Sequence, residues 1–295
     1  MYYLLAFCFL MYFPYVLVNK LTSKHTNSKI VLFKFALYNA AISMLIGVIL
    51  VLIEQTTFVF DFVTLATALM FGVMVGGCRI ATFYSLQVTS VAISNMSATA
   101  SVIIPCFVGM VFFHEAITAG KIIGIIAFLI AAYLIIAQKN KEKQPFTIKS
   151  LLACLIVFFT NGFGAIAMQL FAKYANGVSD SLFLFYSYSF ETVILLAFIF
   201  ISSLNNKPQK NEEPVVFSKD LFWLGAISAA FIFFLHQTNV VLANEIPAVV
   251  LFPVLKSGSL ILGAIVGWMI FKEKLSVKNI IGIIIAIGAL ILLNF

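Results

Sequence analysis

The chain has 295 residues, of which 63% are hydrophobic and only 10% are charged, and its formal net charge is +7. Its mean hydropathy is +1.11. A water-soluble domain of this length has no interior large enough for so much apolar surface. Composition therefore excludes a soluble fold and predicts a protein embedded in a lipid bilayer.

Ten apolar runs follow one another along the chain, each near the roughly 20 residues that a spanning helix needs. They consist of continuous Leu, Ile, Val, Phe and Ala, whereas a β-barrel strand alternates apolar and polar residues. In chain order the runs are 2–19, 30–53, 63–86, 91–113, 119–137, 150–172, 181–203, 220–243, 246–271 and 277–294. The sequence predicts an all-α membrane protein with ten transmembrane helices. The first run lacks a cleavage signal, so it is expected to be a spanning helix.

Lysines gather in alternate connections between these runs. They are Lys20, Lys24, Lys29, Lys34, Lys139, Lys141, Lys143, Lys149, Lys207, Lys210, Lys219, Lys272, Lys274 and Lys278. The opposite side has only Lys121 and Lys173. The positive-inside rule makes the lysine-rich connections of this multi-pass cell-membrane protein cytoplasmic and puts both termini outside. The charge is thus interpreted as an orientation signal, which argues against a nucleic-acid partner.

The cysteines and histidines suggest neither a metal centre nor an enzyme. Cys8, Cys78, Cys106 and Cys154 each lie inside an apolar run without CxxC spacing, which is typical of reduced, buried side chains. The His-Glu pair at 114–115 lacks the second histidine of a zinc-protease motif. No nucleophile with a matching base is evident, and no cofactor is expected.

An internal repeat is visible in the sequence. "EAITAGKIIGIIAFLIAAYLII" from Glu115 resembles "EKLSVKNIIGIIIAIGALILL" from Glu273, and Gly124 falls on Gly282 without gaps. The stretch that begins at Leu151 echoes the one that begins at Leu4. Two halves of five helices each would enter the membrane from opposite sides and form inverted repeats. The predicted division is a first repeat over 1–137, a cytoplasmic linker over 138–149 and a second repeat over 150–295.

These stretches also resemble a transporter superfamily. The run 246–295, with Ile-Pro, Ser-Gly, a charged turn and a final helix with Gly, looks like the last two helices of the small multidrug resistance family. "FKEKLSVKNIIG", "FHEAITAGKIIG" and "LFKFAL" at 32–37 resemble motifs of ten-helix EamA-type proteins. Together they resemble the drug/metabolite transporter superfamily, which implies a secondary transporter. Members usually keep both termini in the cytoplasm, whereas the lysine pattern here indicates the opposite.

Three charged side chains lie deep inside the apolar runs. Each costs roughly 2.5–3.5 kcal/mol at a helix centre, so it must be paired or solvated. Glu191 and Lys256 are central, and Arg79 lies about two turns from a helix end. All three are predicted to line a transport pathway, with a structural Glu191–Lys256 ion pair as the alternative. By resemblance to the nucleotide-sugar branch, where a ninth-helix lysine faces the anionic part of the substrate, Lys256 is the candidate anion ligand.

Further polar side chains in the runs are candidates for the rest of the binding site. They are Tyr12, Tyr15, Tyr84, Ser94, Asn95, Ser97, Asn161, Tyr186 and His236. Ser94 and Ser97 share one helix face, and packing between helices is the alternative role for them. His236 titrates in the physiological range when unperturbed, and a purely structural role is the alternative.

The sequence thus predicts a secondary transporter for a small anionic or zwitterionic metabolite. Amino acids and related carboxylates fit best, and a phosphate-bearing solute is a variant. The expected partners are the solute, the lipid bilayer and a proton or other coupling ion, with the chain a monomer or weak homodimer. One alternative is a proton-coupled exporter of cationic drugs, in which Glu191 replaces the first-helix carboxylate that this chain lacks. The other is a non-transporting membrane scaffold subunit.

Overall fold

A computed structural model describes residues 2–23, 29–88, 91–116, 118–136, 147–175, 177–205, 219–270 and 276–293. In these residues the chain forms α-helices and no strands. The helices are α1 (Tyr2–Ser23), α2 (Lys29–Ile53), α3 (Phe62–Val88), α4 (Val91–Ala100), α5 (Ile103–Val111), α6 (Ala119–Ile136), α7 (Ile148–Tyr174), α8 (Asp180–Asn205), α9 (Lys219–Glu245), α10 (Ala248–Met269) and α11 (Val277–Leu293). The predicted all-α class is confirmed.

Apolar surface covers the outside of these helices as well as their core. Seven helical stretches of the described chain are long and apolar enough to cross a membrane, and three shorter apolar helices accompany them. Ile126 and Ile130 on α6, and Ile284 and Ile287 on α11, are largely exposed. Water does not tolerate apolar patches of this extent, whereas lipid does. The prediction of a membrane protein with several spanning helices is therefore confirmed.

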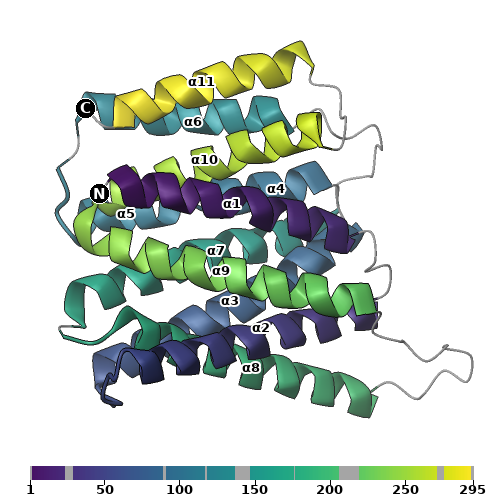
Figure 1. The fold of residues 1–295 in the computed structure, drawn as a ribbon. Coiled ribbons are helices and arrows are strands. Elements are labelled where there is room, and N and C mark those ends of the chain that lie inside the picture. Colours follow the sequence, from purple (N-terminus) through teal and green to yellow (C-terminus); the bar gives the residue numbers. More distant parts are fainter. Residues whose placement is uncertain are drawn as a thin grey trace, which may run out of the picture.

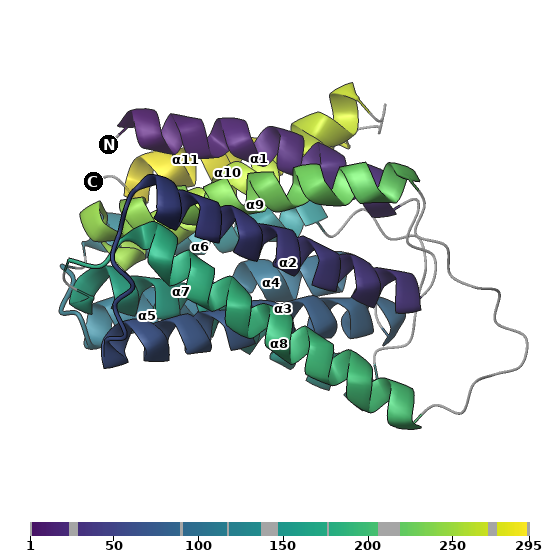
Figure 2. The same ribbon diagram turned by 60° about the horizontal axis from the view of Figure 1, so that its bottom comes forward.

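The helices lie side by side in one bundle with their axes roughly aligned (Figures 1 and 2). α6 packs against α11 at one edge, and α2 packs against α8 at the opposite edge. Between these edges α3 runs along α7 and α8, while α1 runs along α9 and α10. The N- and C-terminal ends of the chain lie at the same end of the bundle as the junction between α9 and α10 (Figure 1). This end is called the terminal end below.

The predicted helix 91–113 is divided into α4 and α5. Pro105 has no backbone N–H, and its ring would clash with the carbonyl group of Ser101 in a continuous α-helix. The chain adapts with tighter bonds, in which the Ile104 N–H donates to Ser101 O at 3.0 Å and the Val102 N–H donates to Thr99 O at 3.3 Å. The break therefore lies one turn before the proline.

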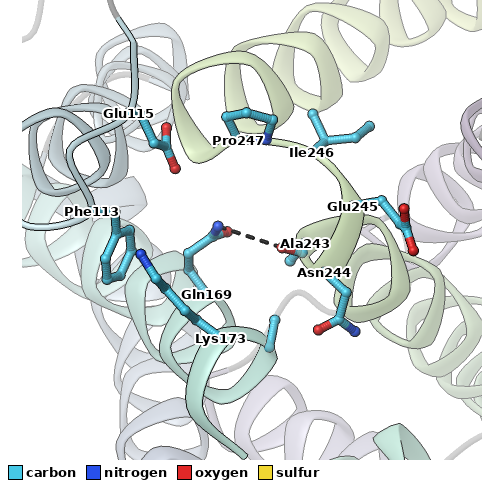
Figure 3. Close-up of a pocket in the computed structure, with 10 residues that line it drawn as sticks. Phe113, Glu115, Gln169, Lys173, Ala243, Asn244, Glu245, Ile246 and Pro247 are labelled. Atoms are coloured by element: carbon cyan, nitrogen blue, oxygen red, sulfur yellow. Dashed lines mark hydrogen bonds between the residues drawn. The ribbon is translucent and has the colours of Figure 1, made fainter.

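Glu115, which opens the repeated motif in the sequence, caps another helix. Its Oε1 accepts a hydrogen bond from the Ala248 N–H at 2.8 Å, and its Oε2 accepts one from the Val249 N–H at 2.9 Å. These groups belong to the first turn of α10, where backbone N–H groups have no partner within the helix and a negative charge is favoured. Figure 3 shows the carboxylate beside Pro247 at the start of α10. The contact joins the connection after α5 to α10, and Glu273 lies outside the described residues.

We expect the Glu115→Ala variant to be less stable by about 1–2 kcal/mol, the upper range for loss of a helix cap. Glu115→Gln retains one acceptor oxygen and should lose less. The free energy of unfolding in detergent micelles measures both effects. Glu245→Ala, which removes an exposed carboxylate at the same end of the bundle, is the control and should be nearly neutral. Equal losses in Glu115→Ala and Glu245→Ala would contradict the capping role.

Candidate functional site

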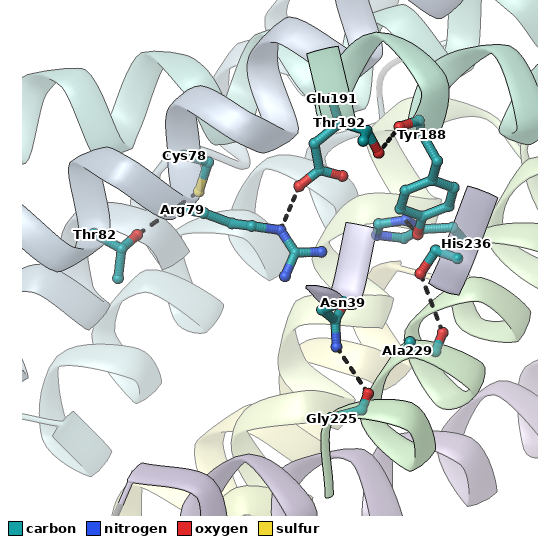
Figure 4. Close-up of polar contacts among 11 residues, drawn as sticks. Asn39, Cys78, Arg79, Thr82, Tyr188, Glu191, Thr192, Gly225, Ala229 and His236 are labelled. Carbon is teal, nitrogen blue, oxygen red and sulfur yellow. Dashed lines mark hydrogen bonds and ion pairs between the residues drawn. The ribbon is translucent and has the colours of Figure 1, made fainter. Parts of the chain in front are cut away.

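An ion pair lies in the middle of the bundle. Arg79 Nε on α3 is 2.5 Å from Glu191 Oε1 on α8, as Figure 4 shows. Glu191 is fully buried, and 24% of the Arg79 side chain is accessible. The carboxylate that the sequence suggested as a partner for Lys256 is thus held by Arg79. The guanidinium bonds it through Nε, so its two terminal nitrogens face away from Glu191 (Figure 4).

Glycines on α3 bring the two members of this pair together. A methyl group at Gly72 would overlap the backbone carbonyl oxygen of Ser187, and one at Gly76 would touch Glu191 Cγ at 3.4 Å. Small residues at such positions allow helix backbones to approach closely in membranes. Glu191 follows Ser187 by one helical turn and Arg79 follows Gly72 by about two turns. The close crossing of α3 and α8 therefore sets the distance between the two charges.

A second polar contact lies next to the ion pair. The hydroxyl group of Tyr188 on α8 is 2.8 Å from Nδ1 of His236 on α9. The edge of the Phe71 ring contacts the same imidazole, with the ring centroids 5.2 Å apart. Tyr188 and Glu191 are three residues apart and share a face of α8. α8 and α9 thus both place polar side chains in the same part of the bundle.

Lys256 approaches this cluster from α10. It is partly accessible, and within the described part of the chain no carboxylate forms an ion pair with it. The charges of Lys256 and Arg79 both act on His236, and Lys256 also interacts electrostatically with Cys78. The two cations therefore flank a common region around His236.

Side chains from α1 and α7 complete the cluster. Tyr15 interacts electrostatically with Arg79, and Tyr12 lies beside Tyr15, with ring centroids 6.5 Å apart. Asn161 Nδ2 on α7 donates to Cys78 Sγ at 2.9 Å. Seven residues proposed from the sequence thus meet, and they come from six helices. They are Tyr12, Tyr15, Arg79, Asn161, Glu191, His236 and Lys256.

Five other candidates do not join them. Ser94 Oγ is 2.5 Å from Ser85 Oγ, and Ser97 Oγ donates to Ile93 O at 3.1 Å within α4. Ser94 therefore links α4 to α3, whereas Ser97 bonds within its own helix. The remaining three lie elsewhere: Asn95 is exposed, Tyr84 is 44% exposed, and Tyr186 donates to Val59 O at 3.3 Å near the terminal end.

Three members of the cluster were not expected from the sequence. Tyr188 and Cys78 flank the ion pair, and Asn239 accepts a hydrogen bond from Cys8 Sγ at 3.2 Å. Helical spacing could have identified Tyr188, which lies three residues before Glu191 on the same face. The same spacing applies to Asn239, which lies three residues after His236 on α9, and nothing comparable singles out Cys78.

The cluster contains cations, an anion, an imidazole and several hydroxyl groups, which suits reversible binding of a small polar solute. Within the described residues, no three His, Cys, Asp or Glu side chains gather in a way that could hold a metal ion.

No family model matches the sequence. An uncharacterised protein of Haemophilus influenzae is 24% identical over 211 residues, which cover 72% of this chain and 69% of that protein. A protein of known crystal structure has a TM-score of 0.73 to this chain, with 13% sequence identity, over 98% of both chains. At that identity the likeness shows the fold alone. The chain is therefore an all-α membrane protein that shares its overall fold with this crystallised protein.

Proposed function

We propose that the protein is a secondary transporter that moves a small anionic or zwitterionic metabolite, such as an amino acid or a related carboxylate, by alternating access. The observation that carries this proposal is the ammonium group of Lys256, which has no carboxylate partner among the described residues and lies within electrostatic range of His236. A scaffold gains nothing from such charges inside a membrane bundle, where each is costly unless paired or solvated. A solute site explains why they are retained.

The charge balance of the cluster favours an anionic group on the solute. Glu191 neutralises Arg79, and Lys256 has no carboxylate partner among the described residues. The region therefore has a net positive charge, which attracts a carboxylate and repels a cationic drug. An exporter of cations needs a free carboxylate, and Glu191 is already bound.

Accessibility supports a solute space at this depth. Arg79 contacts Glu191 on α8, and Tyr15 on α1, Tyr188 on α8 and His236 on α9 lie within electrostatic range of it. The Arg79 side chain is 24% accessible, so part of it borders space that a solute could enter. Lys256 is also partly accessible. Both side chains are therefore accessible in part.

The pattern of helix contacts supports two inverted repeats of five spanning helices, with α4 and α5 acting as one span. If the two halves are equivalent, α1 corresponds to α7, α2 to α8, α3 to α9, α4 with α5 to α10, and α6 to α11. Each contact between two helices should then have a counterpart between the corresponding helices. The α3–α7 contact then becomes α9–α1, the α3–α8 contact becomes α9–α2, and the α1–α10 contact becomes α7–α4 and α7–α5. All of these contacts occur, and the α2–α8 and α6–α11 contacts map onto themselves, whereas the smaller α7–α9, α8–α9 and α6–α10 contacts have no counterpart of similar extent. Such symmetry is typical of carriers with a site between the halves, and of the superfamily that the motifs resemble.

The lysine pattern supports an orientation as well. The chain enters α2, α7, α9 and α11 beside Lys34, Lys149, Lys219 and Lys278, and all four of these helix ends lie opposite the terminal end (Figure 1). By the positive-inside rule we propose that this end is cytoplasmic and that the terminal end is external.

Transport into liposomes tests this function. We expect reconstituted protein to exchange at least one of three labelled preparations: a mixture of L-amino acids, succinate, or glycerol 3-phosphate. Lys256→Met should raise the KM for that solute roughly 10- to 100-fold, because a hydrogen bond to a charged group contributes about 1.5–3 kcal/mol. Lys256→Arg should retain most of the affinity.

Lys278→Met is the matched control, since it removes an exposed lysine from α11, and it should transport normally. The proposal fails if the wild-type protein exchanges none of the three preparations. The role of Lys256 fails if Lys256→Met keeps the wild-type KM.

A further inference from the structure

A separate cavity opens at the terminal end of the bundle. It has a volume of about 260 Å³ and lies between the C-terminal turns of α7 and α9, the connection after α5 and the start of α10. Phe113, Ala172, Ile246 and Pro247 form its apolar walls. The cavity can hold a molecule of amino-acid size and is distinct from the cluster around Arg79.

A buried acceptor without a partner lines this cavity. Gln169 on α7 is 6% exposed, and its Nε2 donates to the Ala243 carbonyl oxygen at a long 3.5 Å. Its Oε1 is buried and has no hydrogen-bond partner. A buried acceptor left unpaired costs about 1–3 kcal/mol. Figure 3 shows this side chain at the centre of the cavity, so a ligand with N–H donors would satisfy it.

A cation without an anionic partner lies one turn further along α7. Lys173 Nζ is 4.2 Å from the centroid of the Phe113 ring, over its face. In the described chain it makes neither an ion pair nor a hydrogen bond. A cation–π contact leaves the three N–H donors of an ammonium group free to bind a carboxylate.

Glu115 provides further acceptors on the opposite wall. Each of its two oxygens accepts one backbone N–H from α10, and a carboxylate oxygen has room for a second donor. The carboxylate points into the cavity in Figure 3, whereas that of Glu245 points away. The α10 contacts hold Glu115 in place, so it can accept a donor without losing side-chain freedom.

We propose that this cavity is an external binding site for an α-amino acid with an apolar side chain. Lys173 binds the carboxylate, Gln169 Oε1 and Glu115 accept hydrogen bonds from the ammonium group, and the side chain lies against the apolar walls. One cation and one carboxylate face the cavity, so a zwitterion matches its charge better than a net anion or cation.

The same two helices, α7 and α9, line this cavity and carry residues of the central cluster. Gln169 follows Asn161 by eight residues, about 12 Å along α7, and Ala243 follows Asn239 by four, about 6 Å along α9. The Gln169–Ala243 contact separates the two regions. The inference rests on the proposed function in treating this cavity as external and as the site where the transported solute first binds. The binding of a zwitterion there is tested separately.

Protection of an introduced thiol tests the site directly. Asn244 lines the cavity and is exposed, whereas Cys8, Cys106 and Cys154 are buried and Cys78 is half-buried. We would measure the rate at which a small methanethiosulfonate reagent labels Asn244→Cys in micelles, with the unsubstituted protein as background. The test compounds are L-leucine, isocaproate, which lacks the amino group, and isoamylamine, which lacks the carboxylate. L-leucine at ten times its Kd should slow labelling about tenfold, because only the unliganded protein reacts.

Isocaproate and isoamylamine should leave the rate unchanged, and adding Lys173→Met should abolish the protection by L-leucine. Lys173→Arg in the same background should retain it, which separates loss of the charge from failure to fold. Protection should persist when Lys256→Met is added. The proposal is overturned if L-leucine does not protect, or if isocaproate or isoamylamine protects equally. Protection by L-leucine in a protein that transports nothing would refute the transport function and leave this site standing.

Discussion

Replacing Arg79 with Met should destabilise the protein by about 3–5 kcal/mol, because it leaves the fully buried carboxylate of Glu191 without its cation. Glu191→Met leaves the guanidinium unpaired and should cost less, since 24% of the Arg79 side chain is accessible and can be hydrated. The measurement is the free energy of unfolding in mixed micelles.

The double variant Arg79→Met/Glu191→Met distinguishes a charge effect from a packing effect. Replacing a buried ion pair with apolar residues of similar volume is often neutral or stabilising. We therefore expect the double variant to recover most of the loss and to show a coupling energy in a double-mutant cycle. Losses that simply add would show that the two charges do not depend on each other. Lys34→Met, which changes an exposed side chain on α2, should be neutral.

The second large effect is expected at Gly72. A methyl group there meets the backbone carbonyl oxygen of Ser187, which no change of side-chain rotamer can relieve. α3 and α8 must then move apart. Overpacking of this kind typically costs about 1–3 kcal/mol, and the movement also separates Arg79 from Glu191. We expect Gly72→Ala to lose stability and to weaken the coupling energy between these two residues.

Gly263→Ala is the matched control for Gly72→Ala. Gly263 also lies inside a helix, α10, but a methyl group at that position meets nothing within 4 Å. Alanine is more favourable than glycine in a helix interior by roughly 0.5–1 kcal/mol. The two substitutions should therefore shift the free energy of unfolding in opposite directions. If Gly72→Ala is as stable as the wild-type protein, the close crossing of α3 and α8 is not needed to hold the ion pair.

The role of Glu115 could not be predicted from the internal repeat. Matching Glu115 with Glu273 identified a position of special importance but not its role. In the structure Glu115 accepts hydrogen bonds from the first turn of α10, which lies more than 130 residues away along the chain. Such a cap depends on where two distant segments meet, which the spacing of residues within either segment does not reveal.

The amino-acid sequence was enough to predict an all-α membrane protein, because the bilayer requires long apolar helices and excludes free backbone groups. It also determined which charges lie far from both helix ends, since depth follows from position along a helix of known rise. The pairing of Glu191 with Arg79 and not with Lys256 could not be predicted, because the choice of partner depends on the rotation and crossing of the packed helices. The close approach at Gly72 fixes the rotation and the crossing of α3 and α8. Because Glu191 then pairs with Arg79, the ammonium group of Lys256 has no carboxylate partner among the described residues.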